Sequence, residues 1–153
     1  MNTKLSVIKS SPRETVATAT LVVETGGQGF VEITGEAKRF IREVNADTGA
    51  LLLFIRHTSA SLVIQENADP DVRVDLLNAL DRLAPADAGW THDVEGPDDM
   101  PAHIKTMLTG VSLQVPVVDG TLALGAWQGI YVAEHRSRSH RREIVLQYSG
   151  SAR

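Results

Sequence analysis

The last third of the chain carries strand signals almost without interruption, and this limits the fold to one with an antiparallel sheet. Four short runs rich in apolar and β-branched residues follow one another, at 113–118, 121–124, 129–133 and 143–147. The first two are separated by Asp119-Gly120, a dipeptide typical of tight β-hairpins. The pattern predicts an antiparallel meander over this part of the chain.

The first half alternates between strand and helix patterns. Residues 15–23 are β-branched and predict a strand, and the Gly-Gly-Gln-Gly run at 26–29 predicts a turn. Apolar residues at helical spacing predict a helix over 35–45. The continuous apolar run 51–55 predicts a central strand, and 61–65 predicts the strand that returns beside it after a turn at 58–60.

Two further helices have clear boundaries. Asp69 and Pro70 predict the cap and first position of a helix that ends before Pro85. Its predicted buried face consists of Val72, Leu76, Leu77, Leu80 and Leu83. Asp98 or Asp99 predicts the cap of a third, short helix, which ends before Gly110.

Together these elements predict an α+β fold: one compact domain over residues 1–153, mostly antiparallel sheet, with about three helices. An apolar content of 42% is enough for a packed core, and the pattern contains no repeat and no linker.

Composition argues against several classes of protein. The net charge of −4 predicts no general nucleic-acid surface, and the arginine-rich stretch 136–142 is the only local candidate for phosphate binding of that kind. The chain has no cysteine, which excludes disulfides and thiolate ligands. Residues 1–9 lack the apolar core of a signal peptide, and no segment is long and apolar enough to span a membrane. We therefore expect a cytoplasmic protein without a membrane or nucleic-acid partner.

The stretch 90–105 concentrates side chains that carry chemistry. It contains His92, His103, Lys105 and four carboxylates around the start of the third helix, and such groups are costly to bury for packing alone. Further polar clusters follow predicted strands at 56–59, 65–67 and 134–136. We expect these clusters to line one site for a metal ion, a phosphate group, or both.

No contiguous metal-binding motif is present, so a metal site would be assembled from distant segments. Nitrogen and oxygen ligands without thiolate suit zinc or manganese, or magnesium where carboxylates and phosphate dominate. Each cluster also has a purely structural explanation. Asp98 and Asp99 suit helix capping, Glu66 and Asn67 could support the cap of the second helix, and Ser59 suits a tight turn.

Several of these stretches resemble the secondary thiamine-phosphate synthase family, also called YjbQ-like, from about residue 15 to the C-terminus. The resemblance is carried by His57-Thr-Ser-Ala-Ser-Leu62, Glu66-Asn67 with Asp69-Pro70, His92-x-x-Glu95-Gly96, Asp98-Asp-Met-Pro-x-His103-Ile-Lys105, Ser112-Leu113, and Leu124-Gly-x-Trp127-Gln-Gly-Ile130 followed by Glu134-His135-Arg136.

The resemblance implies a small α+β protein that assembles as a homotrimer and has weak thiamine-phosphate synthase activity. That transferase reaction joins hydroxymethylpyrimidine diphosphate to thiazole phosphate and releases pyrophosphate, which a divalent cation and basic side chains would stabilise. On this basis His92, His103 and His135 are the expected metal ligands, and His57, Glu66 and Glu134 are expected to act as catalytic or histidine-orienting groups. The expected substrate-binding residues are Ser59, Asn67, Lys105, Trp127, Gln128 and Arg136.

Two alternatives remain open at this point. The chain could be a trimeric module that binds a metal ion or a small phosphorylated metabolite without catalysis. It could also be a hydrolase that uses histidine-bound, metal-activated water.

Overall fold

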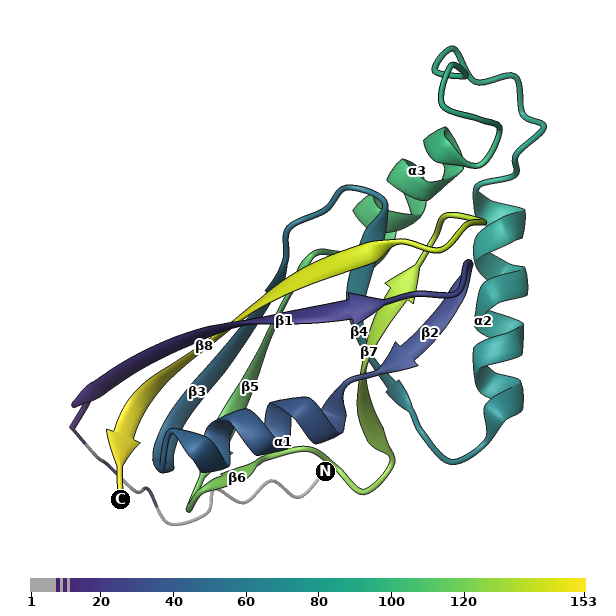
Figure 1. The fold of residues 1–153 in the computed structure, drawn as a ribbon. Helices are drawn as coiled ribbons and strands as arrows, with labels where there is room; N and C mark the ends of the chain where they lie inside the picture. Colours follow the sequence, from purple (N-terminus) through teal and green to yellow (C-terminus); the bar gives the residue numbers. More distant parts are fainter. Residues whose placement is uncertain (1–7, 9, 11) are drawn as a thin grey trace.

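The computed structural model describes residues 8, 10 and 12–153, and these contain eight strands and three helices (Figure 1). The prediction that 1–9 is not a signal peptide lies outside the described residues except at position 8. In chain order the elements are β1 (Thr15–Glu24), β2 (Gly29–Glu32), α1 (Thr34–Glu43), β3 (Ala46–Ile55), β4 (Ala60–Glu66), α2 (Pro70–Leu83), α3 (Asp99–Thr109), β5 (Ser112–Val118), β6 (Thr121–Leu122), β7 (Gln128–Glu134) and β8 (Arg141–Ala152).

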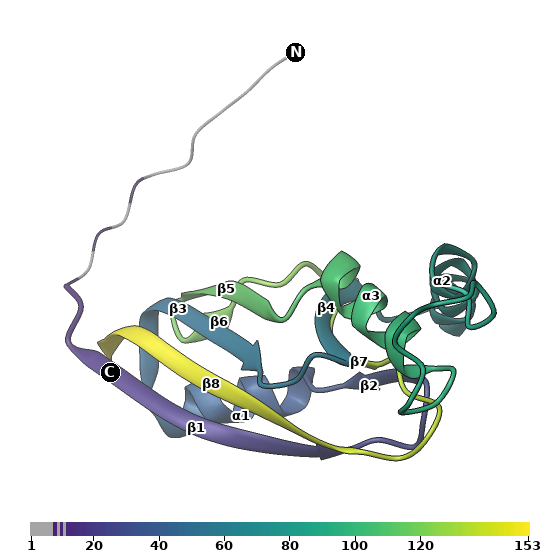
Figure 2. The same cartoon turned by 90° about the horizontal axis from the view of Figure 1, so that it is seen from above.

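The larger sheet has five antiparallel strands in the order β1-β8-β3-β5-β6. The predicted central strand is confirmed, because β3 lies between β8 and β5. Its alternate residues Leu51, Leu53 and Ile55 are fully buried on the face that packs against α1. Helix α1 crosses this concave face and buries Ala37, Phe40 and Ile41 against it (Figure 2). The core of the molecule therefore lies between α1 and this sheet and continues to Leu62 of β4 and Ile130 of β7 in the smaller sheet.

The smaller sheet has the order β2-β7-β4, which the sequence patterns did not predict. Strand β4 exists where a returning strand was expected, but it pairs with β7 and not with β3. The predicted meander is also wrong beyond the β5–β6 hairpin, because β7 joins the smaller sheet and β8 inserts between β1 and β3. Local patterns specify that a strand forms, whereas the partner depends on which faces can be buried together.

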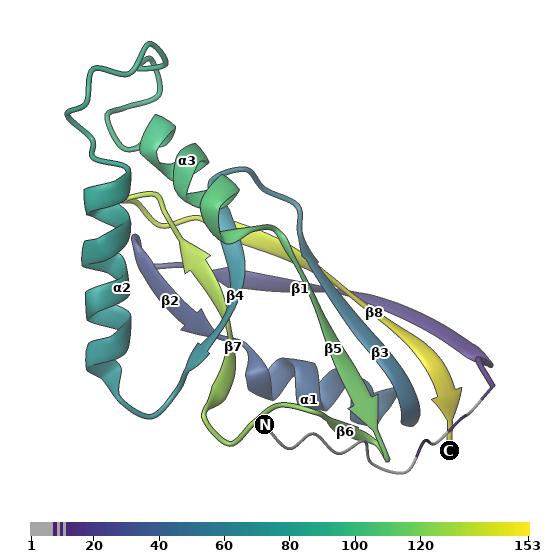
Figure 3. The same cartoon turned by 180° about the vertical axis from the view of Figure 1, so that it is seen from behind.

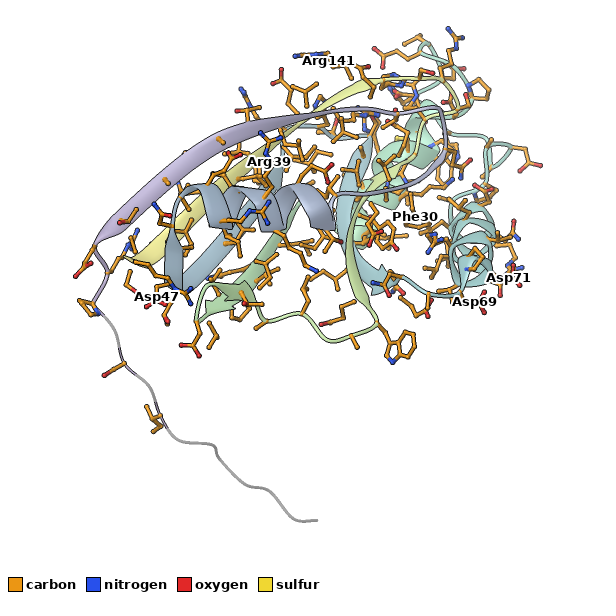
Figure 4. The ribbon with its side chains drawn as sticks, turned by 60° about the horizontal axis from the view of Figure 1, so that its bottom comes forward. Phe30, Arg39, Asp47, Asp69, Asp71 and Arg141 are labelled. Carbon is orange, nitrogen blue, oxygen red and sulfur yellow. The ribbon has the colours of Figure 1, made fainter. Side chains whose placement is uncertain are left out.

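Helix α2 begins as predicted, with Asp69 accepting a hydrogen bond from the backbone N–H of Asp71 at 2.9 Å (Figure 4). The predicted buried face is wrong. None of the residues of α2 is buried in this chain, and Leu83 is 66% exposed. The helix stands at the outer side of β2, away from the larger sheet (Figure 3). The predicted residues Val72, Leu76, Leu77 and Leu80 are only partly covered, and polar contacts that apolar periodicity does not identify also join the helix to the body.

Helix α3 packs on β4 and ends at Gly110, whose φ of 98° is a conformation that glycine adopts without strain. A long loop from residue 84 to residue 98 connects α2 to α3. Among the described residues, no helix has the length and apolarity needed to cross a membrane.

Candidate functional site

The start of α3 and the loop before it bring three potential metal ligands together. Asp99 Oδ2 lies 2.7 Å from His92 Nε2 and 3.2 Å from His103 Nε2. One ligand atom from each of the three residues lies within 4.8 Å of the other two. Asp99 is almost completely buried, whereas the side chains of His92 and His103 are 41% and 32% exposed. The cluster is thus anchored by a buried carboxylate and open to solvent through its imidazoles.

A backbone contact sets the orientation of His103. Its Nδ1 lies 2.8 Å from the carbonyl oxygen of Thr58, which can only accept a hydrogen bond, so Nδ1 carries the proton. In the neutral ring the lone pair is then on Nε2, which points at Asp99. Helical spacing makes this possible, because Asp99 and His103 are four residues apart and lie on one side of α3.

Arg136 organises the carboxylates around this cluster. Its Nε donates to Asp98 Oδ2 at 2.9 Å, its Nη1 to Asp99 Oδ1 at 2.5 Å, and its Nη2 to the carbonyl oxygen of Glu95 at 2.9 Å. The guanidinium that was predicted to bind phosphate is therefore already engaged by two carboxylates. It links the end of β7 to the loop that carries His92.

Asp98 occupies the N-cap position of α3, but its side chain makes no capping hydrogen bond. It accepts instead from the backbone N–H and the hydroxyl of Ser137, and from Arg136. Burial opposes ionisation of Asp98, but these hydrogen bonds outweigh it and lower the pKa to about 2. The pKa of Asp99 is also lowered, because contacts with His92, Glu95 and Arg136 outweigh its burial. Both carboxylates are anionic at neutral pH, as a cation site requires.

The second group of predicted residues forms an interior network. The carboxylate of Glu134 accepts from Arg142 Nε at 2.7 Å and Nη2 at 2.5 Å, and from Thr25 Oγ1 at 2.8 Å. Arg142 also donates to Ser59 Oγ at 3.0 Å. Burial would raise the pKa of Glu134, but the contact with Arg142 and the other hydrogen bonds lower it. In this structure Glu134 and Ser59 hold β7, β8 and the β3–β4 turn together.

His135 lies in the same interior and not in the three-residue cluster. Its Nε2 is 2.7 Å from Ser61 Oγ, which in turn is 2.5 Å from Thr109 Oγ1. The residue is only 2% exposed, and the Nδ1 atom of its ring has no hydrogen-bond partner among the described residues. Burial, reinforced by the charge of Lys105, lowers the pKa of His135 to about 4, so the ring is neutral at physiological pH.

His57 and Lys105 also point away from the cluster. His57 Nε2 accepts from the backbone N–H of Glu143 at 2.9 Å, and burial together with the charge of Arg142 lowers its pKa. Lys105 is buried, and its Nζ lies 2.5 Å from Asp81 Oδ1 on α2. Lys105 is two residues from His103, so it leaves the other side of α3.

The remaining predicted residues lie at the far end of the smaller sheet. Ala60 pairs with Glu134 at one end of the β4–β7 ladder, and Glu66 pairs with Gln128 at the other. Six residues of strand separate the ends by about 20 Å. Asn67 and Trp127 share the far end through a backbone hydrogen bond of 3.1 Å. Glu66 there accepts from the backbone N–H of Asp69, which supports α2 as the structural alternative predicted.

Asp99 was not predicted as a potential ligand, because its position at the start of a helix suggested capping. Its spacing of four residues before His103 was the signal that could have identified it. Arg142 and Asp81 were also missed. No local pattern marks them, because their partners are 8 and 24 residues away and belong to other elements.

Fold and site together define a class: a small α+β protein with two curled antiparallel sheets and a two-histidine, one-carboxylate cluster at the start of its last helix. The profile of the family described as UPF0047 protein YjbQ-like matches residues 19–151, and the chain belongs to this family.

Individual relatives agree with this assignment. A UPF0047 protein of Synechocystis is 45% identical over 85% of this chain and 89% of its own length. The UPF0047 protein YjbQ of Salmonella typhimurium is 42% identical over 86% and 96% of the two chains. A YjbQ/UPF0047 family protein of Clostridium acetobutylicum, whose crystal structure is known, is 36% identical and superposes with a TM-score of 0.79 over 85% and 98% of the two chains. The predicted YjbQ-like α+β fold is thus confirmed.

Proposed function

We propose that the protein binds a divalent cation at His92, Asp99 and His103 and acts there on a small phosphorylated metabolite. The observation that carries this proposal is the meeting of three potential ligand atoms at one point, with Asp99 Oδ2 at 2.7 Å from one imidazole nitrogen and 3.2 Å from another. We further propose that the chain works as a homotrimer, as its resemblance to the thiamine-phosphate synthase family implies.

The proton positions support a cation at this point. With Nδ1 of His103 donating to Thr58, its Nε2 and Asp99 Oδ2 are both acceptors when the ring is neutral. Two acceptors at this distance repel each other unless a proton or a metal ion lies between them. The Thr58 contact is also the kind of hydrogen bond that orients histidine ligands in metalloproteins.

The donor atoms suit particular ions. Two imidazole nitrogens and one carboxylate oxygen, with no thiolate, fit zinc or manganese better than magnesium, which prefers an all-oxygen environment. When bound, such an ion would supply positive charge that stabilises a phosphate or diphosphate leaving group. Arg136 would keep Asp99 and the 95–98 loop in place for that ion.

The most concrete reaction for this site is weak thiamine-phosphate synthesis, carried out as a side activity. The reaction needs stabilisation of the leaving group's charge and correct positioning of the substrates, but it needs no protein nucleophile. A cation at the cluster would stabilise that charge, and none of the three residues has to act as a nucleophile. Support comes from the family motifs that contain His92, Asp99 and His103.

Binding without catalysis is the second candidate, and one observation favours it. Both cations expected to hold substrate phosphate are neutralised within this chain, Lys105 by Asp81 and Arg136 by Asp98 and Asp99. A site that only binds a metal ion would not need these two cations to be free for a substrate phosphate.

Metal analysis tests the ligand set. We expect about one zinc or manganese ion per chain in the purified protein, or saturable uptake on addition, with thermal stabilisation. His92→Ala, Asp99→Asn and His103→Ala should each abolish uptake, whereas His140→Ala, outside the cluster, should not. Wild-type protein that holds no stoichiometric metal and takes up none would remove the assignment.

Complementation of a thiamine-requiring strain then separates catalysis from binding. Wild-type protein should restore growth, and folded His92→Ala and His103→Ala variants should not. Rescue that survives both substitutions would dissociate the activity from the cluster. Metal uptake without any rescue would leave the binding function.

A further inference from the structure

A groove runs between α1 and β6, at a different place from the histidine cluster. It consists of two hollows of about 490 and 440 Å³ that share Lys38 of α1 and Thr121 and Leu122 of β6. We call this the α1–β6 groove. Arg153 lies at one end of it, and Asn67 and Gln128 lie at the other. Nothing in the proposed metal chemistry uses this groove.

The Arg153 end is lined by three cations and no carboxylate. Lys38 and Arg42 are one helical turn apart on α1, so their side chains lie on the same side of the helix. Neither makes an ion pair with another residue in the part of the chain that the structure describes, and both are exposed. Arg153 is held in place by Asp47, at 3.2 Å from its Nε. Unpaired cations on one side of a hollow attract a ligand with clustered negative charge.

The other end of the groove offers hydrogen-bonding groups. The Oε1 atom of Gln128 accepts from the backbone N–H of Gly125 at 2.8 Å, which fixes the side chain and leaves its amide nitrogen able to donate. Glu32, the one carboxylate of the groove lining, is bonded to Thr34 at 3.1 Å. Leu122 and Leu124 provide apolar wall between the two ends.

We propose that the α1–β6 groove binds a small-molecule di- or triphosphate, with its phosphates against the unpaired cations Lys38 and Arg42 and its remaining part toward Asn67 and Gln128. The site is separate from the metal cluster. Gln128 is at one end of the β4–β7 ladder, whereas Glu134 is at the other end, next to Arg136, which donates to Asp99 of the cluster. The proposal goes beyond the function proposed above and does not depend on it.

The structure offers a matched control for testing this site. Arg39 is adjacent to Lys38 in sequence but lies on the side of α1 that faces β1, where it pairs with Glu43 at 2.7 Å (Figure 4). Removing Arg39 changes the net charge as removing Lys38 does, and leaves the groove intact.

Titration calorimetry with inorganic pyrophosphate tests the proposal. Wild-type protein should bind saturably, and Lys38→Ala with Arg42→Ala should weaken binding at least tenfold, since two charge-assisted contacts are lost. Arg39→Ala should bind as wild type, and in the presence of a chelator, which keeps metal out of the histidine cluster, so should His92→Ala with His103→Ala. Thermal unfolding of each variant checks that these exposed substitutions leave the fold intact.

Three results would overturn the proposal. One is the absence of saturable pyrophosphate binding to the wild-type protein. The second is equal weakening by Arg39→Ala, which would indicate general attraction to surface charge. The third is loss of binding in the histidine double variant with retention in the Lys38/Arg42 double variant, which would place pyrophosphate at the metal cluster.

Discussion

Individual charged residues inside this protein act mainly on one another. Glu134 and Arg142 form a buried ion pair with two hydrogen bonds, and the neutral ring of His135 lies next to Glu134 in the chain. A buried pair of this kind is costly to break, because the remaining charge has no partner. The family motif at 134–136 therefore has a structural role that is visible in this chain, in addition to any role in catalysis.

The lowered pKa of His135 makes stability depend on pH. The unfolded chain binds a proton at His135 near pH 6.5, whereas the folded protein resists protonation until about pH 4. Stability is therefore lost as the pH falls, by about 2 kcal/mol between pH 7.5 and 5 from this residue. Urea unfolding at both pH values should show this loss in the wild type and a smaller loss in His135→Gln. An equal loss in both proteins would contradict the assignment, and His140→Gln serves as the control.

At the scale of elements, α2 is joined to the body through polar contacts. Lys105 of α3 and Gln28 of the β1–β2 turn both donate to Asp81, at 2.5 and 2.8 Å. At the other end of the helix, Arg73 donates to the hydroxyl of Tyr131 at 3.3 Å. Because no residue of α2 is fully buried, these polar contacts contribute to fixing its position on the molecule.

We expect Asp81→Asn to lower the free energy of unfolding by about 1 to 3 kcal/mol, because it leaves the buried ammonium of Lys105 without its counter-charge. Hydrogen exchange of α2 amides should become faster. Asp75→Asn removes an equal charge from the same helix, at an exposed position, and should change stability by less than about 0.5 kcal/mol. Equal effects of the two substitutions would show that the Lys105 contact does not hold α2.

At the scale of the whole molecule, the convex face of the larger sheet carries exposed apolar side chains among polar ones. Register places Val22, Leu52 and Phe54 on the same face, opposite to the core residues Leu51 and Leu53. Leu52 and Phe54 are 40% and 42% exposed. A strand face of this kind favours association between copies of the chain, in agreement with the proposed homotrimer.

Light scattering, which measures the mass of the particle in solution, tests the proposed homotrimer. Wild-type protein should have three times the mass of one chain, and Leu52→Glu with Phe54→Glu should reduce the mass to that of one chain while circular dichroism stays native-like. Val74→Glu introduces a charge at an exposed apolar position of α2 and should leave the assembly unchanged. A wild-type monomer would contradict the trimer.

Local patterns were sufficient for most elements and insufficient for their pairing. Asp69-Pro70, the spacing of Ala37 and Phe40, and Asp119-Gly120 act within a few residues of themselves, so the helices and the hairpin were correctly predicted. The division into two sheets was not, because β4 pairs with β7 across more than 60 residues of chain. Apolar periodicity failed for α2, since the same pattern fits a face covered within the chain and a face left exposed.

The candidate site, like the fold, could be predicted from local sequence only in part. The residue types and the i, i+4 geometry of Asp99 and His103 are properties of the chain itself, and they establish that a nitrogen–oxygen cluster is available at the start of α3. Tertiary structure alone decided that His92 joins them, that His57 and His135 do not, and that Lys105 and Arg136 are paired with carboxylates. These outcomes depend on distances between segments remote in sequence, and such distances are set by burial of the shared core and not by any local preference.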